Sequence, residues 1–337
     1  MPVITLSYGG ISADIWTLGA AVNDLRLPDR DGRVASVVLG YANRADRLAG
    51  RAYCGEIVGP VANRIGADGY SIDQVVYRPE LNEPAATLHS GSAGFHRADW
   101  TVRQADARQV VLGLDWASPD GGFPGPIRAE VRYRLDDAGL SHRIVASAPV
   151  ATNLNIVSHP YFNLSGGGVD IGDHELTVPA SRFLPVDDNL MPLADAPWSL
   201  DGSALDLRAG VRLGDVIAAD DPQIRAHAGL DHAYILDQTG ILDGQGWRLA
   251  ARLYHPGSGR QLTISTDQAA LQIYTGQGLD DARIAHPGGA GGAYAGVALE
   301  TEAYPGAANR PDFESILVRP GEEFDHTTIW RFAVIDR

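Results

Sequence analysis

The stretch IRAEVRYRLDDAGLSHRIVASA, residues 127–148, has the clearest periodicity in the chain and decides the fold class. In its first half, apolar residues such as Ile127 and Val131 alternate with arginine and glutamate. Successive side chains of a strand point to opposite faces, so this alternation predicts a half-buried strand. Residues 136–139 (DDAG) are a turn sequence, and a second alternation begins at Leu140. The stretch therefore predicts a β-hairpin with one face in water.

Similar short runs, separated by turn residues, occur on both sides of this hairpin. They predict strands over residues 3–8, 13–23, 35–39, 55–61, 100–116, 175–186, 247–254, 261–266, 270–275, 315–318 and 327–334. No long stretch has the 3.6-residue period of a helix, and only residues 211–218 and 278–284 could form short helical turns. The 39 glycines and 20 prolines suit a fold with many turns. We expect an all-β fold, a large antiparallel β-sandwich or an open barrel, in a single domain over residues 1–337.

Charge and composition exclude several classes of function. The formal net charge is −15, and all 27 basic residues are arginine. A chain without lysine cannot form a Schiff base, and it cannot supply the lysine of a Walker phosphate loop. An acidic chain with scattered arginines is also a poor candidate for binding nucleic acid.

The same composition bears on where the protein works. The single cysteine, Cys54, excludes an internal disulfide and fits a reducing compartment. No apolar run approaches the ~20 residues that a membrane helix needs. The first residues, MPVITLSYGG, lack the basic and apolar regions of a secretory signal. We expect a cytoplasmic protein that does not associate with membranes, as a monomer or a homodimer.

Two carboxylates occupy an apolar strand near the end of the chain, in GVALETEAYPGAANRP, residues 296–311. Strand alternation places Glu300 and Glu302 on the face opposite Val297 and Leu299. One interpretation is a strand with a solvated face. The other is a general base held on a rigid sheet and desolvated enough to work near neutral pH.

Five other segments carry polar residues within apolar strand patterns. These are Asn63 and Arg64 in GPVANRI (59–65), His89 in LHSGSAGFHRADW (88–100), His159 in NLNIVSHPYFNLSG (153–166), Asp231 in GLDHAYIL (229–236), and Gln272 with Tyr274 in LQIYTG (271–276). Taken singly, each residue is more often structural: a hydrogen-bonded histidine, a turn cap or a polar residue on a wet face. A sandwich can nevertheless bring such groups together on one concave face. Together with aromatic neighbours, they suit the binding of sugar hydroxyls.

Other catalytic patterns are missing. Ser92 is not in a nucleophile elbow, because Ser90 stands where the first glycine of that motif should be. His89, His159 and Glu300 could form a metal site, but no HExxH, His-x-His or CxxC pattern supports one, so we expect no metal. No GxGxxG motif is present either, which argues against a dinucleotide, and we expect no cofactor.

The segments GPVANRI, LHSGSAGF, NLNIVSHPYFNL, GLDHAYIL, LQIYTGQGL and ALETEAYPGAANRPDFESILVRPGEEFDHTTIWRF, in this order, resemble the aldose 1-epimerase (galactose mutarotase) family. The resemblance covers nearly the whole chain. It implies a β-supersandwich that interconverts the α and β anomers of free hexoses or pentoses without a cofactor.

The resemblance also implies roles for individual residues. By position, Glu300 matches the general base of the family and His159 its general acid, while His89 resembles a second active-site histidine near the ring oxygen. Arg64, Asp231 and Gln272 match its ligands for sugar hydroxyls, with Asn63 as a neighbouring binder. The choice of Glu300 over Glu302 as the base rests on the resemblance alone.

The chain departs from the family pattern at three positions. Pro60 replaces an arginine, Ser90 replaces a glycine after His89, and Ser158 replaces an asparagine before His159. The two serines lie beside active-site residues and bear on which sugar is preferred. Two other functions remain open: a hexose-6-phosphate epimerase, which would need further arginines for the phosphate, and a non-catalytic carbohydrate-binding protein of the same fold.

Overall fold

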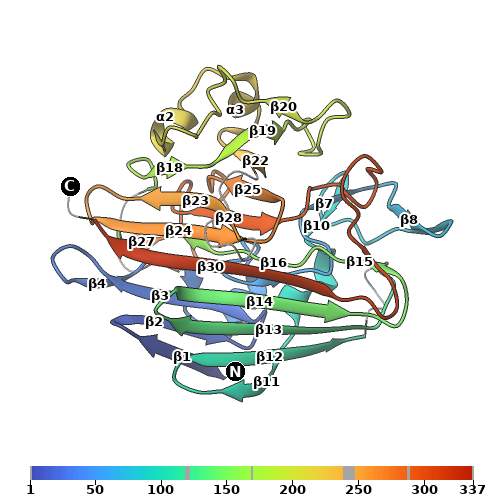
Figure 1. Cartoon of the computed structure of the whole chain (residues 1–337), viewed down its shortest axis with the longest axis horizontal. Coiled ribbons are helices and arrows are strands. Elements are labelled where there is room, and N and C mark those ends of the chain that lie inside the picture. The colour runs from blue at the N-terminus through green and yellow to red at the C-terminus, as the bar shows by residue number, and fades with distance from the viewer. Residues whose placement is uncertain (1, 118–121, 168–169, 238–246, 287–288, 336–337) are drawn as a thin grey trace.

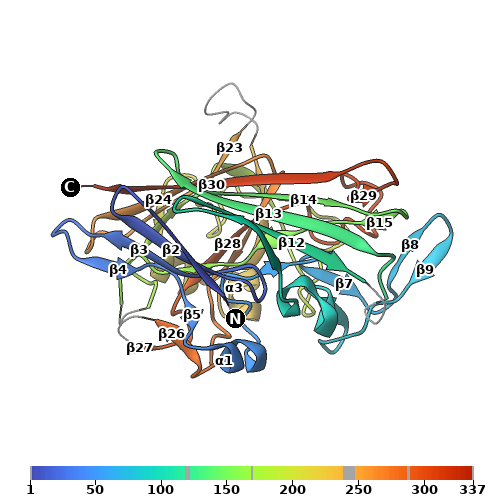
Figure 2. The same cartoon turned by 90° about the horizontal axis from the view of Figure 1, so that it is seen from below.

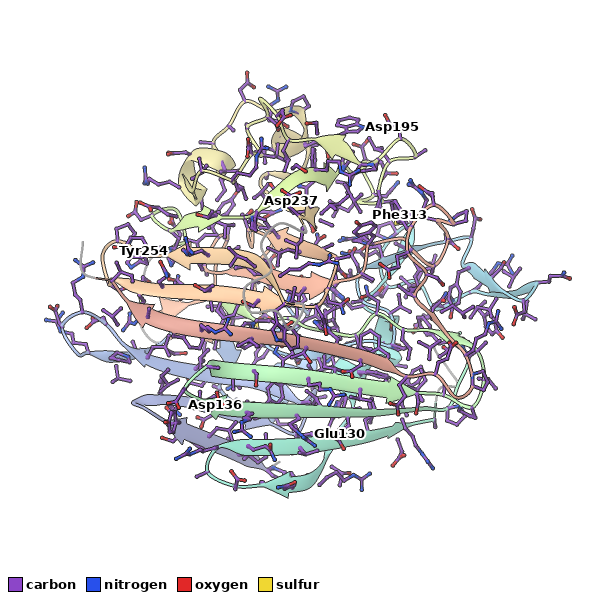
Figure 3. All side chains as sticks on the ribbon, in the orientation of Figure 1. Glu130, Asp136, Asp195, Asp237, Tyr254 and Phe313 are labelled. Carbon is purple, nitrogen blue, oxygen red and sulfur yellow. The ribbon has the colours of Figure 1, made fainter. Side chains whose placement is uncertain are left out.

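The hairpin expected over residues 127–148 lies within the large sheet of the structure. The computed structural model describes residues 2–117, 122–167, 170–237, 247–286 and 289–335. Strands β13 (Ile127–Asp136) and β14 (Gly139–Ser147) pair antiparallel, with Leu135 opposite Leu140. The apolar side chains of β13 are buried and its arginines are exposed, while Glu130 and Asp136 are half-buried (labelled in Figure 3). The expected hairpin and its wet face are confirmed.

A nine-stranded antiparallel sheet forms one layer of the molecule (Figure 1). In spatial order its strands are β11 (Thr101–Ala105), β12 (Gln109–Trp116), β13, β14, β30 (Phe324–Val334), β24 (Arg260–Thr266), β23 (Arg248–Tyr254), β18 (Glu175–Thr177) and β21 (Val211–Arg212). The C-terminal strand β30 pairs with β14 on one side and β24 on the other, so the two halves of the sheet are joined by the end of the chain.

Two further sheets form the opposing layer, beneath β14 and β30 in Figure 2. The four-stranded sheet contains β1 (Val3–Tyr8), β2 (Ile11–Trp16), β3 (Ala21–Pro28) and β4 (Val34–Ser36). The six-stranded sheet contains β17 (Tyr161–Phe162), β28 (Val297–Glu302), β25 (Ala270–Tyr274), β22 (Asp231–Leu236), β19 (Ala180–Leu184) and β20 (Trp198–Ser199). The expectation of an all-β fold with large antiparallel sheets is confirmed.

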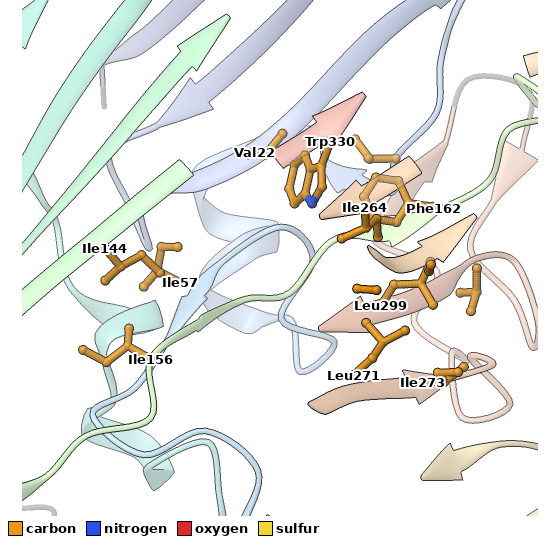
Figure 4. Close-up of a cluster of buried hydrophobic side chains, with 14 of the residues drawn as sticks. Val22, Ile57, Ile144, Ile156, Phe162, Ile264, Leu271, Ile273, Leu299 and Trp330 are labelled. Atoms are coloured by element: carbon orange, nitrogen blue, oxygen red, sulfur yellow. The ribbon is translucent and has the colours of Figure 1, made fainter. Parts of the chain in front are cut away.

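The hydrophobic core lies between these layers. Leu271, Leu299 and Ile264 are fully or almost fully buried there beside Trp330 of β30 (Figure 4). Burying a side chain of this size stabilises the fold by about 1.5–3 kcal/mol relative to leaving it exposed. One face of β28 and β25 therefore packs in the core, and their other face points away from it.

Shorter elements complete the fold. They are β5 (Gly40–Tyr41), β6 (Ile57–Val58), β7 (Arg64–Gly66), β8 (Tyr70–Ile72), β9 (Val75–Tyr77), β10 (Ala86–Leu88), β15 (Thr152–Asn153), β16 (Val157–Ser158), β26 (Ile284–His286), β27 (Gly289–Ala290), β29 (Leu317–Val318), α1 (Arg44–Ala49), α2 (Leu213–Ile217), α3 (Pro222–His227) and two 3₁₀ turns, Gly91–Ala93 and Phe95–Arg97.

Several sequence-based boundaries differ from the structure. The strand expected over residues 13–23 is divided by a turn at residues 17–20, where Gly19 and Ala20 have positive φ angles of 70° and 47°. The helical turn expected over residues 211–218 is confirmed as α2, whereas residues 278–284 form no helix. Helices α1 and α3 are each 6 residues long, too short to give a helical period in the sequence. None of the helices in the described ranges is long and apolar enough to span a membrane.

Candidate active site

Strand β28 buries both of its faces. Val297 and Leu299 join the core between the layers, while Glu300 and Glu302, on the other face, are only 3% and 1% exposed. The solvated-face interpretation of this strand is therefore wrong. A buried carboxylate costs free energy unless it is paired or protonated, so the surroundings of these two glutamates decide what they can do.

Neighbouring strands extend a row of polar groups away from Glu300. Gln272 lies directly opposite Glu300 in the pairing of β25 with β28, and its amide Nε2 donates to Asp231 Oδ1 of β22 at 2.6 Å. Since adjacent strands lie about 4.8 Å apart, the three side chains form a row across the sheet.

This row forms the floor of a cavity of about 330 Å³. All seven residues that were expected to bind or act on the sugar line it: Asn63, Arg64, His89, His159, Asp231, Gln272 and Glu300. They come from well-separated segments of the chain, and the fold brings every one of them to the same hollow.

Arg64 is held in place by acids on both sides. Its guanidinium makes two hydrogen bonds to the Glu83 carboxylate, at 2.7 and 3.0 Å, and lies 3.7 Å from Asp231. A bidentate pair of this kind fixes the plane of the guanidinium as well as its position. Arg64 therefore presents a fixed set of donors to the cavity.

The neutral form of His89 is set by the backbone. Its Nδ1 accepts a hydrogen bond from the backbone N–H of Asn63 at 3.2 Å, and burial holds its pKa well below the usual range. A neutral imidazole whose Nδ1 accepts must carry its proton on Nε2. His89 is therefore a hydrogen-bond donor through Nε2.

Glu300 and His159 face each other across a contact of 3.4 Å between Oε1 and Nε2. Burial, followed by the neighbouring Glu302 and Asp231, raises the pKa of Glu300 well above its usual range. Burial lowers the pKa of His159 to about 4. Desolvation of the imidazole is the main cause of this fall. The rise for Glu300 agrees with expectation.

Glu302, the rival base, points elsewhere. Its carboxylate oxygens accept hydrogen bonds from the side-chain amides of Asn63 and Asn155, both at 3.0 Å. Glu302 is not among the described residues that line the cavity. A base must reach the proton that it removes, so the geometry favours Glu300 over Glu302.

A metal ion is the other chemistry that this site could support. Ligand atoms of His89, His159 and Glu300 lie within 4.8 Å of one another. A metal would need the lone pair of His89 Nε2, which requires a proton on Nδ1, where the Asn63 N–H already points. The arrangement therefore suits hydrogen bonding to a substrate better than coordination of a metal.

Backbone strain marks the cavity wall, and the sequence did not reveal it. Tyr53, Asn63, His89 and Leu190 line the cavity and have positive φ angles between 50° and 62°. Such conformations are costly for residues other than glycine and gather at functional sites. The Tyr53 ring packs edge-on against His89, with 4.6 Å between ring centroids. Neither Tyr53 nor Glu83 belongs to a local pattern that could have identified it.

The departures from the family pattern lie behind the cavity. Ser90 Oγ exchanges hydrogen bonds with the backbone N–H and C=O of Val61, each at 2.9 Å. Neither Ser90 nor Ser158 is among the described residues that line the cavity. Any influence of these serines on sugar preference must therefore pass through the backbone beside His89 and His159.

Comparisons with known protein sequences point to one family. The model of the aldose 1-epimerase family matches residues 2–331. The galactose mutarotase of Bos taurus is 37% identical over 329 residues, and the aldose 1-epimerase of Escherichia coli (strain K12) is 32% identical over 331 residues; each alignment covers 96% of this chain and 92% of the relative.

Solved structures show the same architecture. The galactose 1-epimerase of Lactobacillus acidophilus NCFM is 29% identical, with a TM-score of 0.81 over 98% of this chain and 93% of that one. An aldose epimerase homologue from C. elegans is 24% identical and has a TM-score of 0.90 over 99% of both chains, a likeness of fold. The expected mutarotase-like sandwich is confirmed.

Proposed function

The chain belongs to the aldose 1-epimerase family, and from this premise we propose that it interconverts the α and β anomers of a free aldose by opening and closing the sugar ring. We further propose that Glu300 is the general base and His159 the general acid. The observation that carries this assignment is the buried contact of 3.4 Å between them at the floor of the cavity.

The reaction needs one proton taken and one given. Glu300 removes the proton of the anomeric hydroxyl, His159 delivers a proton to the ring oxygen, and the bond between C1 and the ring oxygen breaks to leave the open-chain aldehyde. Rotation about the C1–C2 bond exposes the other face of the carbonyl. Ring closure returns both protons in the reverse sense, so the pair holds one proton before and after each turnover.

The shifted pKa values suit a pair that exchanges one proton. With the pKa of His159 lowered and that of Glu300 raised by burial, the proton of the free site lies on Glu300. Moving it across the contact of 3.4 Å gives the carboxylate and imidazolium that ring opening uses. The other tautomer is the one that ring closure uses, so each turnover passes through both forms.

We propose that the other five of the seven expected site residues hold the sugar. His89 donates from Nε2 near the ring oxygen, and Arg64, Asp231, Gln272 and Asn63 bind hydroxyl groups. Arg64 and Asp231 are already held by Glu83 and Gln272, so little side-chain freedom is lost on binding.

A neutral sugar suits this cavity better than a sugar phosphate. Apart from Glu300, which holds the proton, four acids line it, at positions 83, 231, 280 and 281, and the arginines among the described lining residues are Arg51 and Arg64. Arg64 is committed to Glu83 and Asp231. A phosphate dianion would thus face an excess of negative charge.

We also propose a cytoplasmic location, a single domain, and a monomer or homodimer that binds only the monosaccharide.

Polarimetry of freshly dissolved α-D-galactose, α-D-glucose and a pentose tests the activity. We expect the wild type to accelerate the approach to equilibrium, and Glu300→Gln and His159→Asn each to lose about 10²–10⁴-fold. Glu314→Gln, a change of an exposed carboxylate, is the matched control and should keep the wild-type rate. Sugar binding by calorimetry without any acceleration over buffer would favour a non-catalytic binding protein instead.

A further inference from the structure

Glu302 lies in a hydrogen-bond network in which both of its oxygens accept. The side-chain oxygen of Asn63 accepts from the backbone N–H of Arg64 at 2.9 Å, and that of Asn155 accepts from the backbone N–H of Ala303 at 3.1 Å. Both amides are therefore oriented with their NH₂ groups toward Glu302. Each of its oxygens faces a donor, and hydrogen bonds accepted by both oxygens favour the ionised carboxylate.

This carboxylate has no cation against it. Within the described ranges, the ion pairs of the site join Arg64 to Glu83 and Asp231, and none involves Glu302. Glu302 and Glu300 are two residues apart on the same strand face, with Cα atoms about 7 Å apart. Two buried carboxylates at this separation resist ionising together, so the pair shares one negative charge.

We propose that Glu302 is a positioning residue for the proposed reaction: held ionised by Asn63 and Asn155 outside the cavity, it keeps the proton of the carboxylate pair on Glu300. This inference rests on the proposed function. Through Asn63, Glu302 also steadies the backbone N–H that sets the proton on His89 Nε2.

The competing state has the proton on Glu302. Burial raises the pKa of Glu302, although the side-chain amides of Asn63 and Asn155 oppose the rise. A proton there would weaken the hydrogen bond that the protonated oxygen accepts. Glu300 has no such restraint, since its described polar contact is His159 Nε2.

The other titratable or charged groups that face Glu300 come from neighbouring elements. They are Asp231 on β22, which raises the pKa of Glu300, Arg64 on β7, which lowers it, and the neutral imidazoles of His159 and His89. The Tyr161 hydroxyl on β17 stays neutral because burial raises its pKa. None of these groups changes in Glu302→Gln, so a shift in that variant reports the charge of Glu302.

The pH profile of kcat/KM, measured for wild type and Glu302→Gln, tests the proposal. The alkaline limb reports loss of the last proton from Glu300 and His159, and we expect it to move to lower pH by about one to two units in Glu302→Gln. Thr301→Val is the matched control: Thr301 is buried on the same strand, faces the core, and should leave the limb in place. A limb that stays put or moves to higher pH in Glu302→Gln overturns the proposal.

A second measurement does not depend on activity or on the folding of Glu302→Gln. Infrared difference spectra at neutral pH compare wild type with Glu300→Gln. We expect the wild type to show a buried carboxylic acid band that disappears in Glu300→Gln. A difference spectrum without this band would show that Glu300 does not carry the proton and refute the proposal. Should the wild type show this band yet not accelerate mutarotation, the proposed function would fail while the charge assignment stood.

Discussion

Single residues in this protein owe their properties to what the fold packs against them. Gln272 and Asp231 are ordinary polar residues of a strand pattern, but their side chains meet at 2.6 Å beside Arg64. Burial raises the pKa of Asp231, and Arg64 and Gln272 offset part of that rise. Asp231 is thereby available as an acceptor for a sugar hydroxyl.

Replacing Asp231 by asparagine should weaken substrate binding more than turnover. A hydrogen bond to a charged acceptor contributes about 1.5–3 kcal/mol, so we expect KM to rise by about 10- to 100-fold, with a smaller fall in kcat. Initial rates over a range of sugar concentrations measure both constants. Asp115→Asn, a change at a side chain that is 67% exposed, should leave both unchanged. An unchanged KM in Asp231→Asn would remove Asp231 from the binding set.

Between elements, buried polar side chains fasten the layers together. Arg260 of β24 is 1% exposed, and its guanidinium donates to five backbone carbonyls, those of Leu27, Pro28, Arg33, Leu164 and Ser165. It therefore ties the nine-stranded sheet to the turn between β3 and β4 and to the loop after β17. The loop after β17 continues the segment that carries His159.

Arg260→Lys should loosen this connection. An ammonium group has three donors, so at least two of the five carbonyls lose their partner, and we expect the free energy of unfolding to fall by about 2–4 kcal/mol. Urea denaturation followed by tryptophan fluorescence gives the value. Arg128→Lys, where the side chain is 85% exposed, should change it by less than about 0.5 kcal/mol. Equal stability of the two variants would show that the Arg260 hydrogen bonds contribute nothing.

The molecule as a whole buries neutral imidazoles. Burial lowers the pKa of His96, His174 and His232 to about 3, and that of His142 well below its usual value. The unfolded chain takes up these protons near pH 6.5, whereas the folded protein does not. The stability that depends on neutral histidines is therefore fully present above pH 6.5 and is lost as the pH falls toward the folded pKa values.

The free energy of unfolding should consequently drop steeply between about pH 6.5 and 4, by about 1.4 kcal/mol per pH unit for each histidine that stays neutral. Urea midpoints at pH 8, 6 and 5 measure the slope. In His142→Leu the slope should be shallower by about 1.4 kcal/mol per pH unit, because the leucine side chain takes up no proton on unfolding. If wild-type stability is the same at pH 8 and pH 5, the buried histidines are not responsible for acid sensitivity.

Much of this protein could be predicted without coordinates. Alternation in residues 127–148 predicted a hairpin that the structure contains. The prediction was possible because a half-buried strand has apolar residues on its buried face and polar residues on its exposed face, and these alternate along the sequence. The seven site residues were identified from ordered motifs, and all seven line one cavity. Segment ends were less predictable: residues 278–284 read as a helical turn but form none, because tertiary packing overrides weak local preference.

The sequence by itself determined the all-β class, the family and the set of polar residues, because strand alternation and motif order are local properties of the chain. Only the tertiary structure distinguished the surroundings of Glu300 from those of Glu302, since they lie on one strand face and differ in what approaches from elsewhere: His159 at one, Asn63 and Asn155 at the other. It also lowers the pKa of His159, because desolvation and neighbouring charge exist only once distant segments have packed together.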